Sequence, residues 1–237
     1  MAVLDELHTD SHGSVAIVSS ALSVARQSMD GVERGGRDMA DEFVIRPGRD
    51  GLLFLAGGDP SGQLSVHEEF EAIVAVAGVH DSRAKLEWLP AGDLAQVVRA
   101  LSMSSATVVH YAGVSTTEGL SLTGDPLHAG APVHPQTLRR ALERGSRRVP
   151  IQLLFFNTCY SPSLVPTMLE PPPIASFVVA NIGKCDDRAA VAFARHFYSR
   201  LFEGMTLRSA FDHASSDASS SVGSSGDYRL WMPASSR

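Results

Sequence analysis

The stretch PIQLLFFNTCYS, residues 150–161, decides how this chain folds. It holds the longest continuous apolar run in the sequence, so it predicts a central strand that is buried on both faces of a sheet. Cys159 follows this strand directly, before a turn, where a thiol is better placed for attack than in mid-strand. The competing interpretation is a small buried apolar residue, which is what most free cysteines are.

Segments with strand-like and helix-like patterns alternate on both sides of this run. Such alternation predicts a mainly parallel sheet covered by helices on both faces, which is the α/β class. In these sheets, functional sites lie beyond the carboxyl ends of the strands. That rule brings residues 57–58, 113–117 and 157–161 to one edge of the sheet. The expected strands are 51–57, 84–89, 106–112, 151–157 and 175–181.

The segments between the strands carry helix signals. Ser65 and Glu68 form a capping-box pattern at the start of SVHEEFEAIVAVAG, and Asp93 is placed to cap DLAQVVRALSM. The strongest helix, DDRAAVAFARHFYSRLFEG, has acids in its first turn and apolar residues at helical spacing. Further helices are expected in HPQTLRRALERG and TLRSAFDHASSD. The serine-rich run ASSSVGSSG, residues 218–226, predicts a mobile loop, and DYRLWMP predicts a last short strand.

The composition bounds the class of protein. The 237 residues are 44% hydrophobic and 19% charged, as in ordinary globular domains. A net charge of -6 argues against nucleic acid as the main partner, because phosphate binding requires a basic face. Two cysteines, Cys159 and Cys185, are too few for a disulfide framework, so we expect reduced thiols in a cytoplasmic protein. No secretory leader pattern and no apolar run of membrane-spanning length is found.

The first part of the chain has a pattern of its own. From Ser14 to Met29, apolar residues recur at helical spacing, and a polar, glycine-containing connector follows. We therefore expect an N-terminal helical extension over residues 1–46 and a main domain over residues 47–237. The expected helix either packs on its own domain or binds a partner.

Five segments together resemble a known family. They occur in the order and spacing of CHAT domains, the bacterial caspase-like cysteine peptidase family, and the resemblance covers about residues 50 to 215. It implies a caspase-like three-layer αβα sandwich with a mainly parallel central sheet. The most specific elements are NTCYS after a long apolar strand and the helix that begins at DDRAA. The segments are FLAGGDPSGQLSVHEEFEAI, VVHYAGVSTTEGLSLTG, LLFFNTCYSPSLV, FVVANIGKCDDRAAVAFARHFYSRLFEG and TLRSAFDHA.

The resemblance also implies a mechanism, in which a cysteine and a histidine together cleave peptide bonds. The imidazole acts as the base for the thiol and as the acid for the leaving amine. The family pattern HFSGHG aligns with HYAGVS, so His110 matches the first, non-catalytic histidine. Val114 then stands where the catalytic histidine belongs, and Ser115 replaces the glycine after it. Because valine cannot carry a proton, the dyad is broken.

Another histidine would have to replace the missing one. His110 lies about 50 residues before Cys159, which is a caspase-like spacing. It stands four residues before the expected place, however, which is about 13 Å of extended chain. Otherwise His110 is a buried histidine that bonds to its neighbours. His128 and His134 lie in the next loop and are weaker alternatives, and the expected helices carry His67, His196 and His213.

Cofactor and metal signals are missing from the sequence. No pair of cysteines or histidines has metal-ligand spacing, and the glycines of GLLFLAGGDPSG form no nucleotide-binding motif, so we expect neither a metal nor a cofactor. A basic cluster around one helix end predicts a solvated surface rather than a partner site. Its members are Arg139, Arg140, Arg144, Arg147 and Arg148.

Three functional hypotheses follow from the sequence. The first is a degenerate caspase-like pseudoenzyme that binds a protein or peptide partner as a regulatory or scaffold component of a bacterial effector or defence system. The second is an active cysteine endopeptidase that uses Cys159 with the displaced His110. The third is an interaction module in which Cys159 is a relic. Substrate preference, partner and oligomeric state cannot be read from the residues.

Overall fold

A computed structural model gives the architecture of the chain. It describes residues 43–46, 49–58, 64–80, 84–90, 92–122, 132–159, 161–184, 186–223 and 226–233. The expected N-terminal helix at 14–29 lies outside the described residues, as do His128 and Cys185.

The described residues form a central six-stranded sheet in the order β2-β1-β3-β6-β7-β8. The first five strands in this order run parallel, and β8 pairs antiparallel with β7 at the edge. All five strands expected from the sequence are present, and the final strand is there as well. A separate two-stranded hairpin, β4 and β5, follows β3. The strands are β1 (Gly51–Ala56), β2 (Lys85–Pro90), β3 (Ala106–Ala112), β4 (Ser115–Thr116), β5 (Gly119–Leu120), β6 (Ile151–Asn157), β7 (Ala175–Asn181) and β8 (Tyr228–Trp231).

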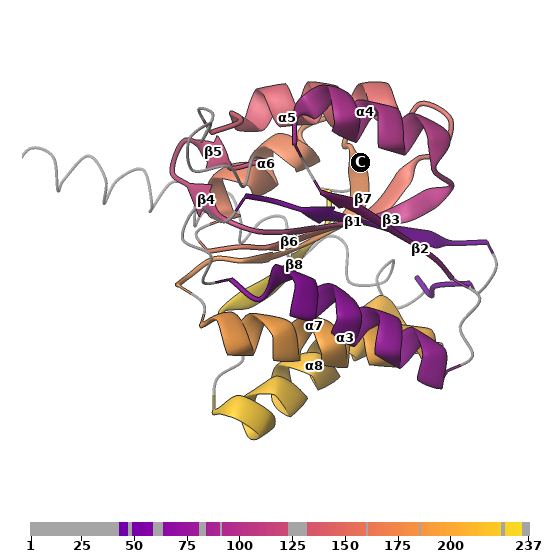
Figure 1. Cartoon of the computed structure of the whole chain (residues 1–237), viewed down its shortest axis with the longest axis vertical. Helices are drawn as coiled ribbons and strands as arrows, with labels where there is room; N and C mark the ends of the chain where they lie inside the picture. Colours follow the sequence, from indigo (N-terminus) through magenta and orange to yellow (C-terminus); the bar gives the residue numbers. More distant parts are fainter. Residues whose placement is uncertain are drawn as a thin grey trace, which may run out of the picture.

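Helices cover both faces of the sheet, which confirms the three-layer αβα sandwich predicted from the sequence. Figure 1 shows α4, α5 and α6 on one face and α3, α7 and α8 on the other. Among the described helices, α7 and α8 make the most extensive contact with each other, and they pack side by side under the sheet. The helices are α3 (Val66–Val79), α4 (Leu94–Met103), α5 (Pro135–Gly145), α6 (Leu164–Leu169), α7 (Asp187–Phe202) and α8 (Leu207–Val222), with a 3-10 turn, η1 (Ser161–Ser163), before α6.

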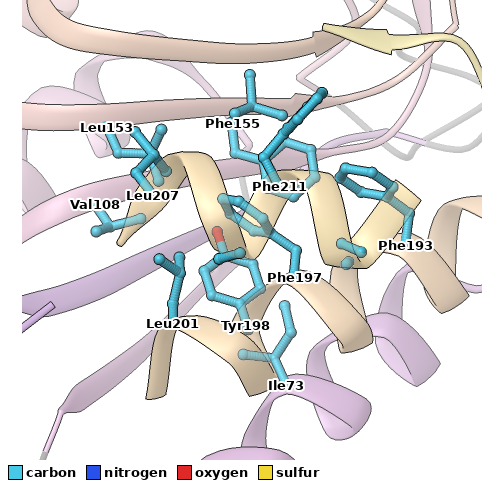
Figure 2. Close-up of a cluster of buried hydrophobic side chains, with 14 of the residues drawn as sticks. Ile73, Val108, Leu153, Phe155, Phe193, Phe197, Tyr198, Leu201, Leu207 and Phe211 are labelled. Carbon is cyan, nitrogen blue, oxygen red and sulfur yellow. The ribbon is translucent and has the colours of Figure 1, made fainter. Parts of the chain in front are cut away.

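Two apolar cores separate the layers, because side chains alternate between the faces along each central strand. On β3, Val108 faces the core under α3 and α7, whereas Val109 faces the core under α4 and α5. Figure 2 shows the first of these cores, where aromatic rings of α7 pack against Phe155 of β6. The Phe155 ring centroid lies 5.4 Å from that of Phe197, in an edge-on arrangement. This packing fixes β6, the strand that leads to Cys159.

The described chain joins the core before the domain boundary expected at residue 47. The Phe43 ring lies 5.3 Å from that of Phe177 on β7, and Ile45 is buried in the same core. The backbone carbonyl of Phe43 accepts a hydrogen bond from the first residue of α8, Leu207. Residues 43–46 therefore belong to the main domain.

The prediction of a serine-rich loop at 218–226 is partly wrong, because α8 continues to Val222 and is capped by Gly223. Ala210, Ala214 and Ala218 recur every four residues and are all fully buried. This spacing gives the segment a helical face that the serine content conceals. The serine hydroxyls bond back to carbonyls of the preceding turn, as Ser219 does to Ser215.

The capping box expected at the start of α3 is also wrong. The Ser65 side chain makes no capping hydrogen bond. Its backbone N–H instead donates to the carboxylate of Asp187, the first residue of α7, at 3.1 Å. The start of α3 is therefore held by the neighbouring helix. The cap expected for α4 is present, because the Asp93 carboxylate accepts a 2.7 Å hydrogen bond from the Gln96 N–H.

One arginine of the predicted solvated cluster is buried. The Arg139 guanidinium donates to the backbone carbonyls of Thr167, Glu170 and Pro172 at the end of α6, so it joins α5 to α6. Long side chains bury their stems readily, and the fork of guanidinium donors satisfies several acceptors at once.

Among the described helices, none is both long enough and apolar enough to cross a bilayer.

Candidate functional site

Cys159 lies two residues beyond the end of β6, at the carboxyl edge of the sheet, as the sequence predicts. Its side chain is half-buried and the 3-10 turn η1 follows it. The Ser161 hydroxyl donates to the Thr158 carbonyl at 3.0 Å, which closes the turn around the cysteine. The thiol is thus held on a short, hydrogen-bonded turn between a central strand and α6.

The loop that carries Val114 touches the loop that carries Cys159. The Ser115 hydroxyl donates a short hydrogen bond to the backbone carbonyl of Cys159. Val114 is half-buried and follows β3 by two residues. The two loops are neighbours because β3 and β6, the strands that they follow, pair directly in the sheet. The residue next to the Cys159 turn, however, is a valine followed by a serine.

A buried tyrosine fixes the backbone around Val114. The Tyr111 hydroxyl lies 2.9 Å from the Val114 carbonyl and 2.6 Å from that of Ser121, and the Ser121 N–H donates to the Val114 carbonyl at 2.9 Å. Gly57 and Gly113 lie so close to this ring that a Cβ on either would collide with it. Two of the glycines at the sheet edge therefore make room for Tyr111.

A small pocket of about 40 Å³ opens beside the thiol. Its walls come from the ends of β3 and β6 and from the first turns of α3 and α7. They include two carboxylates and a threonine hydroxyl, and no lysine or arginine of the described chain. The lining residues are Leu64, Val66, Glu69, Ala112, Gly113, Asn157, Thr158, Cys159, Asp187 and Ala190.

His110 points into the apolar core and is fully buried. Its ring stacks on Phe54, with centroids 4.6 Å apart, and packs edge-on against Phe155. Nδ1 lies 3.0 Å from the Tyr198 hydroxyl, and Nε2 lies 2.7 Å from Oε1 of Glu69, although poorly aligned for a hydrogen bond. Both ring nitrogens therefore face partners within the core.

The register of the sheet separates His110 from the cysteine. His110 pairs with Phe155 across β3 and β6, and Cys159 stands four residues further along the chain. Four residues of strand span about 13 Å. His110 therefore does not line the pocket beside Cys159. Glu69, which His110 contacts, does line that pocket.

Glu69 is the centre of a buried polar network that sequence reasoning missed. Its Oε1 also accepts a 2.6 Å hydrogen bond from the Asn157 amide, whose Oδ1 in turn accepts from the Tyr228 hydroxyl. The network joins α3 to β3, β6, α7 and β8. The alternation of β3 and β6 places His110 and Asn157 on one face, but no pattern in the sequence indicates which helix residue meets them.

The surroundings of Tyr198 fix the protonation of its phenol. Burial, together with the negative charge of Glu69, raises the pKa of the Tyr198 phenol well above its usual value. Tyr198 therefore keeps its proton and can donate it to Nδ1 of His110. Nε2 of His110 faces Glu69 on the other side of the ring, without the alignment of a hydrogen bond.

The other histidines lie elsewhere. His134 caps α5, with Nδ1 accepting from the Gln136 N–H at 3.3 Å. His67 is exposed on α3 and pairs with Glu71. His196 is half-buried on α7, where burial and Arg195 lower its pKa. His213 is exposed on α8. Among the described residues, no group of three acidic, histidine or cysteine side chains could hold a metal ion.

A second, larger cleft of about 510 Å³ lies along the same edge of the sheet, beyond β1 and β2. Trp88 is partly exposed in its wall and stacks on Phe54 behind it, with ring centroids 5.2 Å apart. Leu64 and Val66 line both this cleft and the Cys159 pocket, so the two hollows adjoin. The remaining lining residues are Ala56, Gly57, His67, Pro90, Gly92, Gln96 and Leu122.

Comparisons with known proteins add little to this geometry. No family model matches the chain, and no curated protein matches it. One similar solved structure is that of apo CalE6, a methionine gamma lyase from Micromonospora echinospora, at 12% identity and a TM-score of 0.32. The alignment covers 78% of this chain and 47% of the lyase, so the chain spans less than half the length of that protein. A likeness of this size carries no inference about function.

Proposed function

We propose that this chain is a degenerate caspase-like protein of the CHAT type, which binds a protein partner instead of cleaving one. It acts in the cytoplasm as a regulatory or scaffold component of a bacterial effector or defence system. The observation that carries this proposal is the pair of loops at the sheet edge. The Cys159 turn touches a loop that holds Val114 where the family has its catalytic histidine.

The position of His110 supports the loss of activity. Its ring nitrogens face Glu69 and Tyr198 in the core, and its strand partner Phe155 stands four residues before Cys159. General acid–base help is worth about 10² to 10⁴ in rate, and expulsion of an amine needs the acid in addition to the base. A protein partner fits better than nucleic acid, given the net charge of -6.

The test is a panel of fluorogenic peptides incubated with wild type, Val114→His and Cys159→Ala. We expect no turnover by wild type and no change on Cys159→Ala. Val114→His restores thiol reactivity, and restores cleavage if the neighbouring pocket still accepts a peptide. Cleavage by wild type that disappears in Cys159→Ala would favour the active-peptidase hypothesis. The variants His110→Ala and His128→Ala would then identify the base.

A further inference from the structure

The two outer strands of the central sheet differ in how well they are covered. β8 forms one side of the sheet, and three of its four residues are buried. β2 forms the other side (Figure 1), where none of the six residues is buried and no further strand of the described chain pairs with it. An outer strand presents unpaired N–H and C=O groups, which can form a ladder with another strand. The outer side of β2, called the β2 edge below, is therefore the open end of the sheet.

Two exposed apolar side chains flank the β2 edge on the α3 side of the sheet. Trp88 is 36% exposed, and its ring lies 5.7 Å from that of His67 on α3. Val74 stands about two helical turns after His67, so it lies on the same flank of α3, and it is 42% exposed. Val79 is also exposed, but it is rotated by about 140° from Val74 around the helix and lies on a different flank.

Met103 flanks the β2 edge on the other side of the sheet. It is the last residue of α4 and is 77% exposed. The hydroxyl of the next residue, Ser104, donates a 2.9 Å hydrogen bond to Glu87 of β2, so the end of α4 lies beside this strand. Three of the four large apolar side chains that the described chain exposes therefore surround the β2 edge. Single exposed apolar residues are ordinary, but a group of them around an unpaired strand indicates an interface.

The charges of β2 indicate which strand would pair with it. Lys85 Nζ lies 2.9 Å from Glu87 Oε1, and alternation along the strand puts both side chains on the α4 side of the sheet. A second copy of β2 that runs antiparallel presents the same two charges in reverse order. When a two-fold axis passes through Leu86, Lys85 of each copy stands opposite Glu87 of the other. Opposite charges in this position stabilise a strand pair.

The neighbouring alignments of the two strands are less favourable. An axis through either charged residue places two like charges directly opposite each other, which is destabilising. With the axis through Leu86, the ladder covers residues 84–88, so Pro90, which has no N–H to donate, lies outside it. Trp88 then lies opposite Ala84 of the second copy. The charges and the proline therefore favour the same alignment.

The flanking side chains supply the area that a short ladder lacks. A pair of isolated strands is only marginally stable in water. Because the axis is perpendicular to the sheet, α3 of one copy lies on the same side of the sheet as α3 of the other, and α4 likewise. Val74 and Trp88 on one side and Met103 on the other then lose water on pairing, which stabilises the interface.

We propose that two copies of this chain join at their β2 edges into one continuous sheet, with Leu86 on the two-fold axis and Lys85 of each copy paired with Glu87 of the other. This interface does not include Cys159, so the inference is independent of the proposed loss of catalysis.

Sedimentation velocity of the full chain tests the proposal. We expect wild type to pass from the mass of one chain to that of two between about 1 μM and about 300 μM. Lys85→Glu and Glu87→Lys each place like charges opposite each other, and each weakens self-association at least about ten-fold. Wild type that keeps the mass of one chain throughout, or single variants that dimerise as wild type does, would overturn the proposal.

Mixing the two single variants tests the alignment of the strands. The chain with Lys85→Glu carries two negative charges on β2 and the chain with Glu87→Lys two positive ones, so both cross-strand pairs are complementary again. We expect an equimolar mixture to form a heterodimer although neither variant dimerises alone, and a mixture that stays monomeric contradicts the alignment. Arg147→Glu and Asp212→Lys make the same changes in net charge at exposed sites after α5 and on α8, and both dimerise as wild type does.

Serine substitutions test the apolar flanks of the interface. Val74→Ser and Met103→Ser each weaken the dimer several-fold, because they remove apolar area that pairing buries. Val79→Ser is the matched control on the different flank of α3 and leaves the dimer unchanged. Equal effects of the two valine substitutions would contradict the placement of the interface.

The double variant, Lys85→Glu with Glu87→Lys, keeps the ion pair within the strand and carries the test if a single variant fails to fold. It pairs with itself, but against wild type it meets like charges at both positions. Native mass spectrometry with isotope-labelled wild type measures exchange between the two. We expect homodimers of each and no mixed dimer, and free exchange of subunits would overturn the proposal.

Discussion

Two polar regions lie within a few residues of each other at the carboxyl edge of this sheet, and they differ in how far they are closed. The network of Glu69, His110, Asn157 and Tyr198 is buried and its members contact one another, although Nε2 of His110 is not aligned for a hydrogen bond. The pocket beside Cys159 leaves the Thr158 hydroxyl without one in the described structure. The first region joins α3 and α7 to the sheet, whereas the second opens beside Cys159. His110 belongs to the first.

The largest test of this difference is His110→Ala. Removing the ring leaves a cavity against Phe54 and Phe155 and breaks the contact with the Tyr198 hydroxyl, so we expect the free energy of unfolding to fall by about 3–5 kcal/mol in urea denaturation. The exposed His67 is the matched control, and His67→Ala changes stability by less than about 0.5 kcal/mol. An unchanged stability for His110→Ala would place the ring outside the structural network.

A smaller effect on stability is expected at Gly57, which packs against the Tyr111 ring beside the Val114 loop. A Cβ at Gly57 would collide with the phenol, so Gly57→Ala lowers the free energy of unfolding by about 1–3 kcal/mol. Adding Tyr111→Phe relieves part of that cost, so the double variant loses less than the sum of the two. Gly78 in the last turn of α3 has open space around it, and Gly78→Ala is stabilising by up to about 1 kcal/mol.

The ion pair between Arg200 and Asp217 shows how much a surface charge contributes to the free energy of unfolding. Asp217 accepts a 2.8 Å hydrogen bond from Arg200, which lowers the pKa of the Asp217 carboxyl. A lowered pKa in the folded state stabilises the fold above the ordinary pKa, and this stabilisation is lost as the pH falls through the folded value. Asp217→Asn therefore costs about 0.2–1 kcal/mol at pH 7, and urea denaturation at acid pH shows the difference disappearing. A difference that persists below pH 2 would contradict this assignment.

The smallest effect is expected at Thr158. Because its hydroxyl makes no bond in the described structure, Thr158→Val leaves the free energy of unfolding within about 0.5 kcal/mol of wild type, or raises it slightly. The same substitution at Thr107, whose hydroxyl lies 3.3 Å from the Asp50 carboxylate, costs about 1–2 kcal/mol. Equal costs at the two positions would mean that the Thr158 hydroxyl is paired.

Much of the fold follows from the sequence because its signals are local. The strand at 151–157 and the position of Cys159 beyond it depend on one apolar run and the polar residues after it. The same local logic fails in the serine-rich segment, where composition indicates a loop but the spacing of Ala210, Ala214 and Ala218 makes a helix. Periodicity was the better guide there than residue type.

The site is harder to predict from the sequence than the fold, because its contacts join segments that are far apart in the chain. Alternation along β3 places His110 on a buried face, but its partner Tyr198 stands 88 positions away. Glu69 looks like one of several acids at the start of a helix, and only the packing of α3 against the sheet distinguishes it from Glu68. The residue at position 114, by contrast, needs no structure, because the sequence alone shows that it is valine.

The central claim is that His110 does not assist Cys159, and the rate of Cys159 alkylation by iodoacetamide tests it most directly. Labelling at neutral pH, followed by mass spectrometry, is compared for wild type and Val114→His. We predict slow labelling of wild type and labelling at least about ten-fold faster in Val114→His, because the proposed family alignment puts the new imidazole beside the thiol. Wild type that already reacts as fast as Val114→His, and slows on His110→Gln without losing stability, would contradict the account.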